Sequence, residues 1–507
     1  MAIGRFARHF IGNKTRQHEL GVYMLTARLM QVWTSVAERG RQLLGLGLNG
    51  TAQRIDFLAA DLLSERGEAT NMARAEAIIR LYEKLGKDER YGFHRYLAQN
   101  FLPDAECLKA AAEAYLAEPS AETARCLALV SESPRQELIR RLNVAPGATG
   151  VLVRMREELL ANKEERALLS PLEQDLRHLL ASWFNRGFLE LKRIDWNTSA
   201  AILEKLIAYE AVHEIRGWDD LRRRLAPDRR CFAFFHPALP EEPLIFVEVA
   251  LCQGLAGNIE PLLRIGASSD DFAKADTAVF YSISTCQPGL RGISFGNFLI
   301  KQVVEELHAE LPGLTQFGTL SPVPGFRRWL ENILSTDGDA VLEAERLAIQ
   351  EVGADRVTAS SIGPDWDNLE RTDTRTKRLL LRLLATYLTD ANNGVGPQDP
   401  VARFHLGNGA RLERVHWAAN PSARGIEESL GMMVNYLYDP AIIESNHEQF
   451  AKMGKVAHSR EITELLKRSA RVKPAKSNPR DRSVVVSADR TARIDCITGE
   501  IGDIPPA

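Results

Sequence analysis

The clearest chemical signal in the sequence is a glycine-containing segment, Gln287-Pro-Gly-Leu-Arg-Gly-Ile-Ser-Phe-Gly296. It stands between residues with strand character and residues with helix character. Glycines let backbone N–H groups approach an anion closely, and the following helix adds its positive N-terminal end, so the segment suits a pyrophosphate. It is not a nucleotide P-loop, because the GKS or GKT ending is missing. A plain strand-to-helix turn is the alternative, and the residues alone leave it open.

A second segment, Gly318-Thr-Leu-Ser-Pro-Val-Pro-Gly-Phe326, places Ser321 where a strand is expected to end and the chain to turn. Pro322 and Pro324 restrict the backbone of that turn. A hydroxyl fixed in this way can orient a substrate carboxylate by hydrogen bonding, although serine is also common in ordinary turns. Because no G-x-S-x-G elbow is present, the segment does not predict a hydrolase nucleophile.

A third segment, Ala402-Arg-Phe-His-Leu-Gly-Asn-Gly409, places His405 just before a Gly-Asn-Gly turn. Histidine titrates near neutrality and can act as a general acid or base. A surface or hydrogen-bonded histidine without a catalytic role is the alternative. The nearest rival for the same role is His416, which lies in apolar sequence before Trp417.

Metal and thiol chemistry are not indicated by the sequence. No HExxH motif occurs, and His405 and His416 lack carboxylates at regular spacing. The six cysteines form no CxxC pair, which predicts reduced thiols in an intracellular protein. Cys286, beside the glycine-containing segment, is expected to be a half-buried small residue and not a reactive thiolate.

The three segments must be positioned by a region of mixed strands and helices that begins after about residue 170. Its branched and aromatic runs predict strands, and a strand, a glycine loop, a helix and a strand in succession predict a βαβ-type unit. Strands are expected over residues 231–236, 244–251, 277–285 and 316–320 and around 410–419. Helices are expected over residues 175–190, 200–210, 297–311 and 375–388.

The region before it, from residue 20 to about 165, has apolar residues at three- and four-residue steps, which is typical of helices. Helices are expected over residues 20–44, 71–97, 105–117, 121–129 and 150–160. The predicted fold class is therefore an α+β multidomain protein. An all-helical N-terminal bundle over residues 1–168 precedes a mixed α/β catalytic domain over 169–470 and an irregular C-terminal tail over 471–507.

Composition narrows the range of partners. The formal net charge of the 507 residues is -3, so no basic excess favours nucleic acid. No apolar run approaches the ~20 residues that a membrane span needs. Residues 1–18 carry four basic side chains before the first acid, Glu19, as an import presequence does. They contain few hydroxyls, so we expect a cytoplasmic protein, with the mitochondrial matrix as the alternative.

Part of the glycine-containing segment resembles the coenzyme A loop of the GCN5-related acetyltransferase fold, usually written [QR]-x-x-G-x-[GA]. Arg291 and Gly296 fill the first and last positions, whereas Ser294 stands where the middle glycine is expected. The resemblance implies that the catalytic domain has an acetyltransferase-like fold. The departure at Ser294 suggests a specialised branch of that fold.

Taken together, the three segments resemble the malonyl-CoA decarboxylase family. Further stretches agree with this family in the same order over about 260 residues, which makes the resemblance more specific than any one motif. They are Gln174–Leu180, Glu210–His213, His236–Leu244, Glu248–Leu251, Phe280–Ser284, Arg424–Ile426 and Asn435–Tyr438. The helical N-terminal half is similar to the family more loosely.

The resemblance implies roles for individual residues. Ser321 and His405 match the catalytic pair, and Ser282 and Tyr438 match positions that line the acyl pocket. A loop that should receive the coenzyme A pyrophosphate is matched by Arg291, Gly292, Ile293, Ser294, Phe295, Gly296 and Asn297. Animal members carry a glutamate where Ser294 stands, so a carboxylate is not required there in general. The family is oligomeric, which implies a homo-oligomer, dimer or tetramer, assembled through the helical domain.

The function implied is decarboxylation of malonyl-CoA to acetyl-CoA and carbon dioxide, within fatty acid and malonate metabolism. Ser321 would hold the leaving carboxylate, and His405 would protonate the thioester enolate. No metal or other cofactor is expected, since coenzyme A is part of the substrate and the thioester delocalises the charge. An N-acyltransferase of the same fold would share the coenzyme A loop, and a non-enzymatic coenzyme A sensor or helical scaffold would bind without turnover, so both alternatives stay open.

Overall fold

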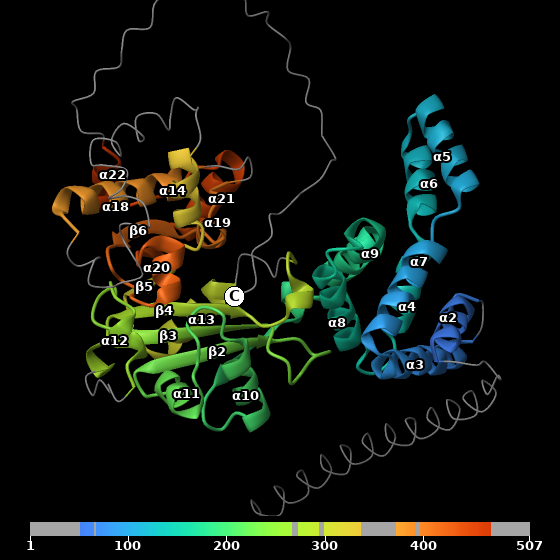
Figure 1. Ribbon diagram of the computed structural model, residues 1–507, viewed down its shortest axis with the longest axis horizontal. Coiled ribbons are helices and arrows are strands. Elements are labelled where there is room, and N and C mark those ends of the chain that lie inside the picture. The colour runs from blue at the N-terminus through green and yellow to red at the C-terminus, as the bar shows by residue number, and fades with distance from the viewer. Residues whose placement is uncertain are drawn as a thin grey trace, which may run out of the picture. The chain divides into compact units, whose positions relative to one another are not determined.

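The computed structural model describes residues 51–64, 67–265, 272–293, 299–335, 372–391 and 396–467 (Figure 1). They divide into two compact units. The helical unit comprises the described residues up to Phe188 together with Pro237–Pro240 and Gln287–Ile293, and the sheet unit comprises the others. The helix expected over 20–44, the loop residues Ser294, Phe295, Gly296 and Asn297, and the tail over 471–507 lie outside the described residues.

Helices alone build the described main part of the helical unit, apart from one 3-10 turn, Arg186–Phe188, as the apolar spacing predicts. Their bounds are α2 Thr51–Leu62, α3 Glu68–Lys84, α4 Lys87–Asn100, α5 Ala105–Ala117, α6 Ala121–Ser131, α7 Pro134–Leu142, α8 Ala148–Ala161 and α9 Arg166–Trp183. The helix over 105–117 is confirmed to the residue. Its start is fixed by the Asp104 side chain, which accepts the backbone N–H of Cys107.

Two expectations for this unit are corrected. The single helix expected over 71–97 is two helices, because Leu85 adopts an extended conformation and Gly86 starts α4. Helix α7 lies in the region expected to be helical, although the sequence did not define its bounds. The boundary expected at residue 168 falls inside α9, whose buried leucines pack in the helical unit, so this unit continues to Phe188.

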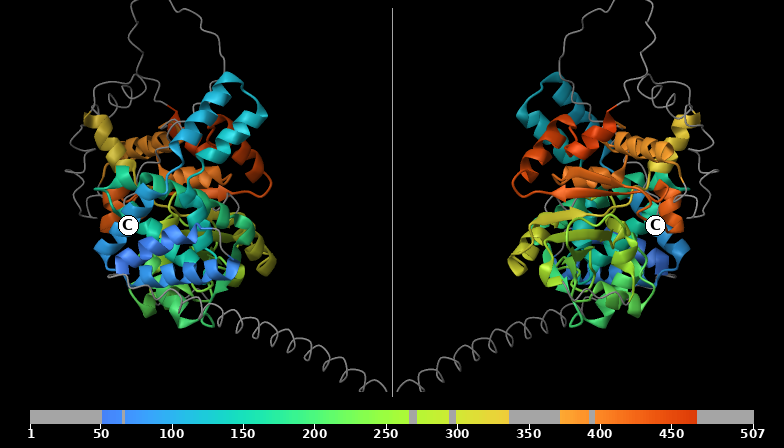
Figure 2. Two further views of the ribbon diagram at one scale, coloured as in Figure 1. Left: turned by 90° about the vertical axis from the view of Figure 1, so that its right-hand side faces the viewer. Right: turned by 90° about the vertical axis from the view of Figure 1, so that its left-hand side faces the viewer.

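The sheet unit is built on seven strands in the order β1-β2-β3-β4-β5-β7-β6. Their bounds are β1 Glu190–Ile194, β2 Arg229–Phe235, β3 Ile245–Cys252, β4 Thr277–Thr285, β5 Gln316–Thr319, β6 Arg411–His416 and β7 Met433–Tyr438. Neighbouring strands are antiparallel except β4 and β5, which are parallel and are joined through α13, Leu299–Glu310. Strands β6 and β7, coloured orange, extend the sheet beyond β5 (Figures 1 and 2).

The helices of the sheet unit complete a mixed α/β architecture. They are α10 Ala200–Tyr209, α11 Trp218–Arg224, α12 Glu260–Leu263, α14 Phe326–Ser335, α18 Thr374–Thr389, α19 Pro400–Gly407, α20 Ala423–Ser429, α21 Ile443–Met453 and α22 Arg460–Leu466. A helical bundle followed by a mixed sheet, with the strand–loop–helix–strand unit β4–α13–β5, confirms the expected fold class.

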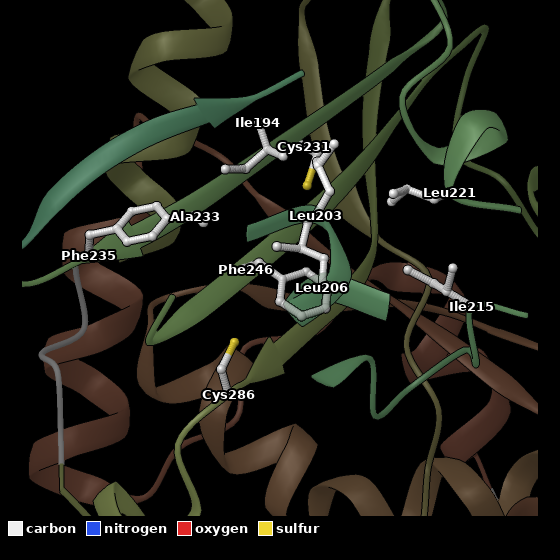
Figure 3. Close-up of a cluster of buried hydrophobic side chains, with 10 residues drawn as sticks. All are labelled: Ile194, Leu203, Leu206, Ile215, Leu221, Cys231, Ala233, Phe235, Phe246 and Cys286. Atoms are coloured by element: carbon white, nitrogen blue, oxygen red, sulfur yellow. The ribbon is translucent and has the colours of Figure 1, made fainter. Parts of the chain in front are cut away.

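The core of the sheet unit explains why β2 and β3 read as continuous apolar runs, since both strands are buried along almost their whole length. One hydrophobic cluster joins side chains of β1, β2 and β3 to α10 and α11 (Figure 3). A second forms around Val279, Tyr281 and Met433. These clusters fix the middle strands, and Ser321 follows the end of β5, whereas His405 lies on α19.

Two strands contradict the sequence-based expectation. The helix expected over 175–190 ends at Trp183, and β1 follows it. Strand β1 is an edge strand whose charged side chains, in the sequence ELKRI, mask its alternation. Strand β7 was not predicted either, although β4 was confirmed at both ends.

Candidate active site

The structure brings Ser321 and His405 together, although 84 residues separate them in the chain. The Oγ atom of Ser321 lies 3.1 Å from Nε2 of His405, within hydrogen-bonding distance. Both side chains are buried, with 6% of Ser321 and 3% of His405 exposed. The two residues singled out from separate segments of the sequence are therefore direct partners.

Backbone geometry fixes Ser321 at the end of β5, as its segment predicts. Its N–H donates to the carbonyl of Val434 at 2.8 Å, and its carbonyl accepts the N–H of Val434 at 3.0 Å. Strand β5 pairs with β4 only from Thr277 to Phe280, whereas β4 continues to Thr285. Beyond Phe280, Ser321 pairs with Val434 of β7 and not with a residue of β4. The two parallel strands β4 and β5 therefore separate at Ser321.

Helix α19 delivers His405 to the site from its last turn. The helix starts at Asp399, whose side chain accepts the N–H of Ala402, and Pro400 occupies its first position. The imidazole stacks on the ring of Tyr436, with centroids 4.6 Å apart and planes 22° apart. Capping at one end and ring stacking at the other hold the imidazole in one orientation.

A chain of uncharged groups continues on both sides of the pair. The Tyr438 hydroxyl lies 2.7 Å from Nδ1 of His405, and the Ser321 hydroxyl donates to Oγ1 of Thr319 at 2.8 Å. Because the Ser321 hydroxyl donates its proton to Thr319, it can only accept a hydrogen bond from Nε2 of His405, so Nε2 carries the proton. Nδ1 then carries no proton and accepts a hydrogen bond from the Tyr438 hydroxyl. The geometry thus selects the tautomer that presents an Nε2–H to the site.

Burial controls the charge of this chain. It lowers the pKa of His405 to about 3 and raises the pKa of Tyr438 well above its ordinary value. Both side chains are therefore neutral at physiological pH. Because Nδ1 of His405 meets a phenol and not a carboxylate, the arrangement differs from a Ser-His-Asp triad, in which an ionised carboxylate stabilises the charged imidazole.

Ser282 lies on β4 and makes its hydrogen bonds to Glu210. Its hydroxyl is 2.8 Å from each carboxylate oxygen of Glu210, which also accepts the backbone N–H of Val212 and His213. Phe280 pairs with Thr319 in the parallel register. Ser282 comes two residues after Phe280, but the register of β4 against β3 shifts between these two residues, so regular alternation does not place Ser282 on the face of Ser321. The described hydrogen bonds of the Ser282 side chain go to Glu210 and Ser284, and not to Ser321 or His405.

Glu210 is a residue that the sequence did not mark as functional. It follows α10 in the chain and belongs to the segment Glu210–His213, which contributes to the family resemblance. Its carboxylate reaches Ser282 across 72 residues and also accepts the Ser284 hydroxyl at 3.3 Å. The one signal that could have indicated it was an acid at the end of a predicted helix, which is too common to single out.

The coenzyme A loop is described only in its first part. Arg291 and Gly292 are exposed, Ile293 is buried, and all three belong to the helical unit. Gly292 has a φ of +73°, a left-handed conformation that favours glycine. Ser294, Phe295, Gly296 and Asn297 lie outside the described residues, so their predicted part in pyrophosphate binding stays a prediction.

The rival candidates occupy other positions. His416 lies on β6 and bonds to Asn435 through Nε2, with no direct bond to Ser321 or His405. Cys286 is fully buried in the first hydrophobic cluster, deeper than expected, and burial raises the pKa of its thiol, as befits an unreactive cysteine. Within the described ranges, no group of three His, Cys, Asp or Glu side chains is placed to hold a metal ion.

The fold and this site define a class of protein: a mixed α/β enzyme whose buried neutral imidazole and hydroxyls can donate hydrogen bonds and a proton to a bound substrate. A family model described as the malonyl-CoA decarboxylase C-terminal domain matches residues 187–476, and one described as the N-terminal domain matches residues 101–184. The chain belongs to the malonyl-CoA decarboxylase family.

Individual relatives support this assignment. The chain is 34% identical over 397 residues to the mitochondrial malonyl-CoA decarboxylase of Rattus norvegicus, an alignment that covers 75% of this chain and 79% of the relative. It is 38% identical over 323 residues to the enzyme of the same name from Anser anser anser, which covers 60% of this chain and spans 64% of the goose enzyme.

Solved structures agree with the described fold. The crystal structure of malonyl-CoA decarboxylase from Rhodopseudomonas palustris is 47% identical, with a TM-score of 0.75, and the match covers 82% of this chain and 100% of that one. The enzyme from Agrobacterium vitis gives the same identity and coverage with a TM-score of 0.73. The family recognised from the sequence is confirmed, and the acyltransferase alternative is not favoured.

None of the described helices combines the length and the apolar character that crossing a membrane requires.

Proposed function

We propose that the chain converts malonyl-CoA to acetyl-CoA and carbon dioxide. The observation that carries the proposal is the buried chain of Tyr438, His405 and Ser321 at the point where β4 and β5 part, in a member of this family. Decarboxylation leaves a thioester enolate, and hydrogen-bond donors in a water-poor site stabilise such an anion as it forms.

The proposed mechanism assigns one task to each group. The Ser321 hydroxyl turns from Thr319 to the substrate carboxylate and holds it out of the thioester plane. The C–C bond breaks, its electron pair enters the enolate, and carbon dioxide leaves. Nε2–H of His405 then protonates the enolate carbon, which yields acetyl-CoA. The Tyr438 hydroxyl stabilises the remaining imidazolate through Nδ1, and Nε2 regains its proton from water. A neutral imidazole serves as the electrophile in other enzymes that stabilise enolates, so the lowered pKa of His405 suits this task.

Tyr438 and Ser282 support the same reaction in different ways. The Tyr438 hydroxyl donates to Nδ1 and so keeps the proton of His405 on Nε2, facing the site. Ser282, whose proton is held by Glu210, would line the acyl pocket through its oxygen atom. The thioester delocalises the developing charge, so we propose that the reaction needs no metal and no organic cofactor.

A single assay tests the activity. The purified full chain is incubated with malonyl-CoA and a chelator, without any amine, and acetyl-CoA is followed by mass spectrometry. Turnover that the chelator does not affect supports the proposal. Product that forms only when an amine is supplied points to an acyltransferase, and saturable binding of coenzyme A without product points to a sensor.

We further propose that the chain is a homo-oligomer, dimer or tetramer, assembled through the α5–α6 hairpin, whose helices lie side by side (Figure 1). Leu116 is 78% exposed and Leu129 61% exposed, and α6 buries none of its own residues. Such apolar surface is typical of a contact site. Replacing Leu116 and Leu129 together by glutamate should lower the mass measured by light scattering, whereas an unchanged mass would contradict this interface.

The compartment and pathway are proposals as well. We propose a cytoplasmic enzyme of fatty acid and malonate metabolism. The names of the goose and rat relatives place those enzymes in mitochondria and support the mitochondrial matrix as the alternative. Cell fractionation with an antibody against the chain would separate the two compartments.

A further inference from the structure

The residues that lead into the coenzyme A loop are held by the helical unit, although the strand before them and the helix after them belong to the sheet unit. Residues Gln287–Ile293 group with the helical unit, and their 3-10 turn, Pro288–Leu290, packs on α8. Of the seven loop residues expected to receive the pyrophosphate, the three that the structure describes, Arg291–Ile293, come directly after this turn.

Arg156 of α8 makes the central contact. Its side chain is 2% exposed, and its Nη1 donates to the carbonyl oxygen of Gly289 at 2.7 Å. Its Nε and Nη2 donate to Oε1 of Glu173, on α9, at 2.9 and 2.7 Å. Helices α8 and α9 therefore both act through one buried guanidinium on the backbone of the turn.

Gly289 shows how closely this turn approaches α8. A Cβ atom at this position would lie 2.0 Å from the carbonyl oxygen of Val153, a distance that real Cβ atoms do not adopt. Only glycine fits against the helix here, so the turn has little freedom to shift. The packing and the Arg156 hydrogen bond locate the same three-residue turn independently.

A second arginine of the helical unit stands beside the loop residues themselves. Nη2 of Arg177, on α9, donates to the carbonyl oxygen of Gly292 at 3.4 Å, and its side chain is half-buried. Burial lowers the pKa of Arg156, and the positive charges of Arg177 and Arg291 act in the same direction. The guanidinium groups of Arg156 and Arg177 thus bond to the backbone on either side of Arg291, and Glu173 is hydrogen-bonded to the buried Arg156.

We propose that Arg177 and Arg291, both in the helical unit, bind phosphate oxygens of coenzyme A, and that Arg156 positions the turn that precedes Arg291. Guanidinium groups match the geometry of phosphate oxygens and stay charged, which suits Arg177 and Arg291 to this task. The inference rests on the proposed use of a coenzyme A thioester and gives the helical unit a role in substrate binding besides assembly.

The test compares ligands with and without phosphates on the full chain. Calorimetry measures the Kd of coenzyme A, and steady-state kinetics compare malonyl-CoA with malonyl-pantetheine, which has the same reacting group but no nucleotide. We expect Arg156→Met and Arg177→Gln each to weaken coenzyme A at least tenfold and to raise KM for malonyl-CoA. Their kcat/KM for malonyl-pantetheine should stay within twofold of the unsubstituted protein.

Arg135→Met is the matched control. Arg135 is also a buried arginine of the helical unit, bonded to an acid, Asp175, and to backbone carbonyls, those of Leu97 and Ala98, but it does not contact the turn. It should leave the Kd of coenzyme A within twofold. Arg156→Lys keeps a donor for Gly289 and should recover part of the affinity, which a general folding defect would not explain.

Defined results overturn the inference. They are an unchanged Kd for coenzyme A in both variants, an equal loss with both thioesters, or the same weakening in Arg135→Met. If Arg156→Met does not fold, Arg177→Gln, at a half-buried position, still decides the question. Coenzyme A binding without decarboxylation by the unsubstituted protein would refute the proposed activity alone, because the calorimetric comparison does not depend on turnover.

Discussion

Two buried polar clusters lie in the sheet unit, and they differ in charge. The cluster around His405 links Tyr438, Ser321 and Thr319 and carries no charge at neutral pH. The cluster around Arg224 is ionic: its guanidinium bonds to Glu248 at 2.5 Å and to Asp220 at 3.2 Å. Charges held this deeply are costly to separate, whereas neutral groups can exchange hydrogen bonds at little cost. We therefore expect the first cluster to govern rate and the second to govern stability.

Replacing His405 by alanine should have the largest effect on rate. Removal of a proton-transfer group typically costs about 10²–10⁴ in rate, so kcat for malonyl-CoA should fall by that order while the Kd of coenzyme A stays within about twofold. His458→Ala is the control, because His458 is exposed and makes no contact with the pair. A His405→Ala variant that keeps near-full turnover would refute the proposed proton donor.

Replacing Arg224 by methionine should have the largest effect on stability. The change leaves the carboxylate of Glu248 buried without its partner, and breaking a buried ion pair from one side costs about 3–5 kcal/mol. Chemical denaturation should show this loss. Arg222→Met, at an exposed position two residues earlier, should stay within about 0.5 kcal/mol.

A second substitution sharpens the interpretation of that loss. Adding Glu248→Gln to Arg224→Met removes the unpaired buried carboxylate of Glu248 and should recover part of the stability. If the double variant is no more stable than Arg224→Met alone, the loss comes from packing and not from an unpaired charge, and the contrast between the two clusters fails.

The sequence predicted the first cluster better than the second. Ser321 and His405 were identified because turn and glycine residues mark the ends of their elements, and β4 was located because a run of branched and aromatic residues resembles a strand. Glu210, Arg224 and Glu248 gave no such sign. Their function depends on side chains that meet only after the strands have paired, and the spacing of single charged residues does not encode that.

The same limit applies to the helical unit. Its helices follow from apolar spacing, and Asp104 and Ser120 mark two of their starts. The contact between Arg156 and Gly289 joins residues 133 positions apart, and nothing in either local segment indicates it. Local patterns predicted the elements, whereas the assignment of residues 287–293 to the helical unit required the tertiary structure.

Replacing Tyr438 by phenylalanine should have a smaller effect on rate than the loss of His405. It removes one hydrogen bond to Nδ1, worth about 1 kcal/mol, so kcat should fall about five- to tenfold. Tyr436→Phe is the matched control: its ring stacks on His405, but its hydroxyl has no hydrogen-bond partner among the described residues. Equal losses in the two variants would mean that the hydrogen bond from Tyr438 to Nδ1 makes no specific contribution to the rate.

The smallest expected effect is that of pH on kcat, and it tests the neutrality of the first cluster directly. An imidazolium donor with an ordinary pKa near 6.5 would lose about tenfold in rate for each pH unit above that value. The pKa of His405 is lowered to about 3, so its neutral form predominates throughout, and kcat at saturating malonyl-CoA should be flat from pH 5 to 8. Burial raises the pKa of Glu248 to about 7, so an inflection that disappears in Glu248→Gln belongs to the ionic cluster. An inflection near 6.5 that persists in Glu248→Gln would show that His405 works as a cation. The expectation that an uncharged cluster governs the rate would then be wrong.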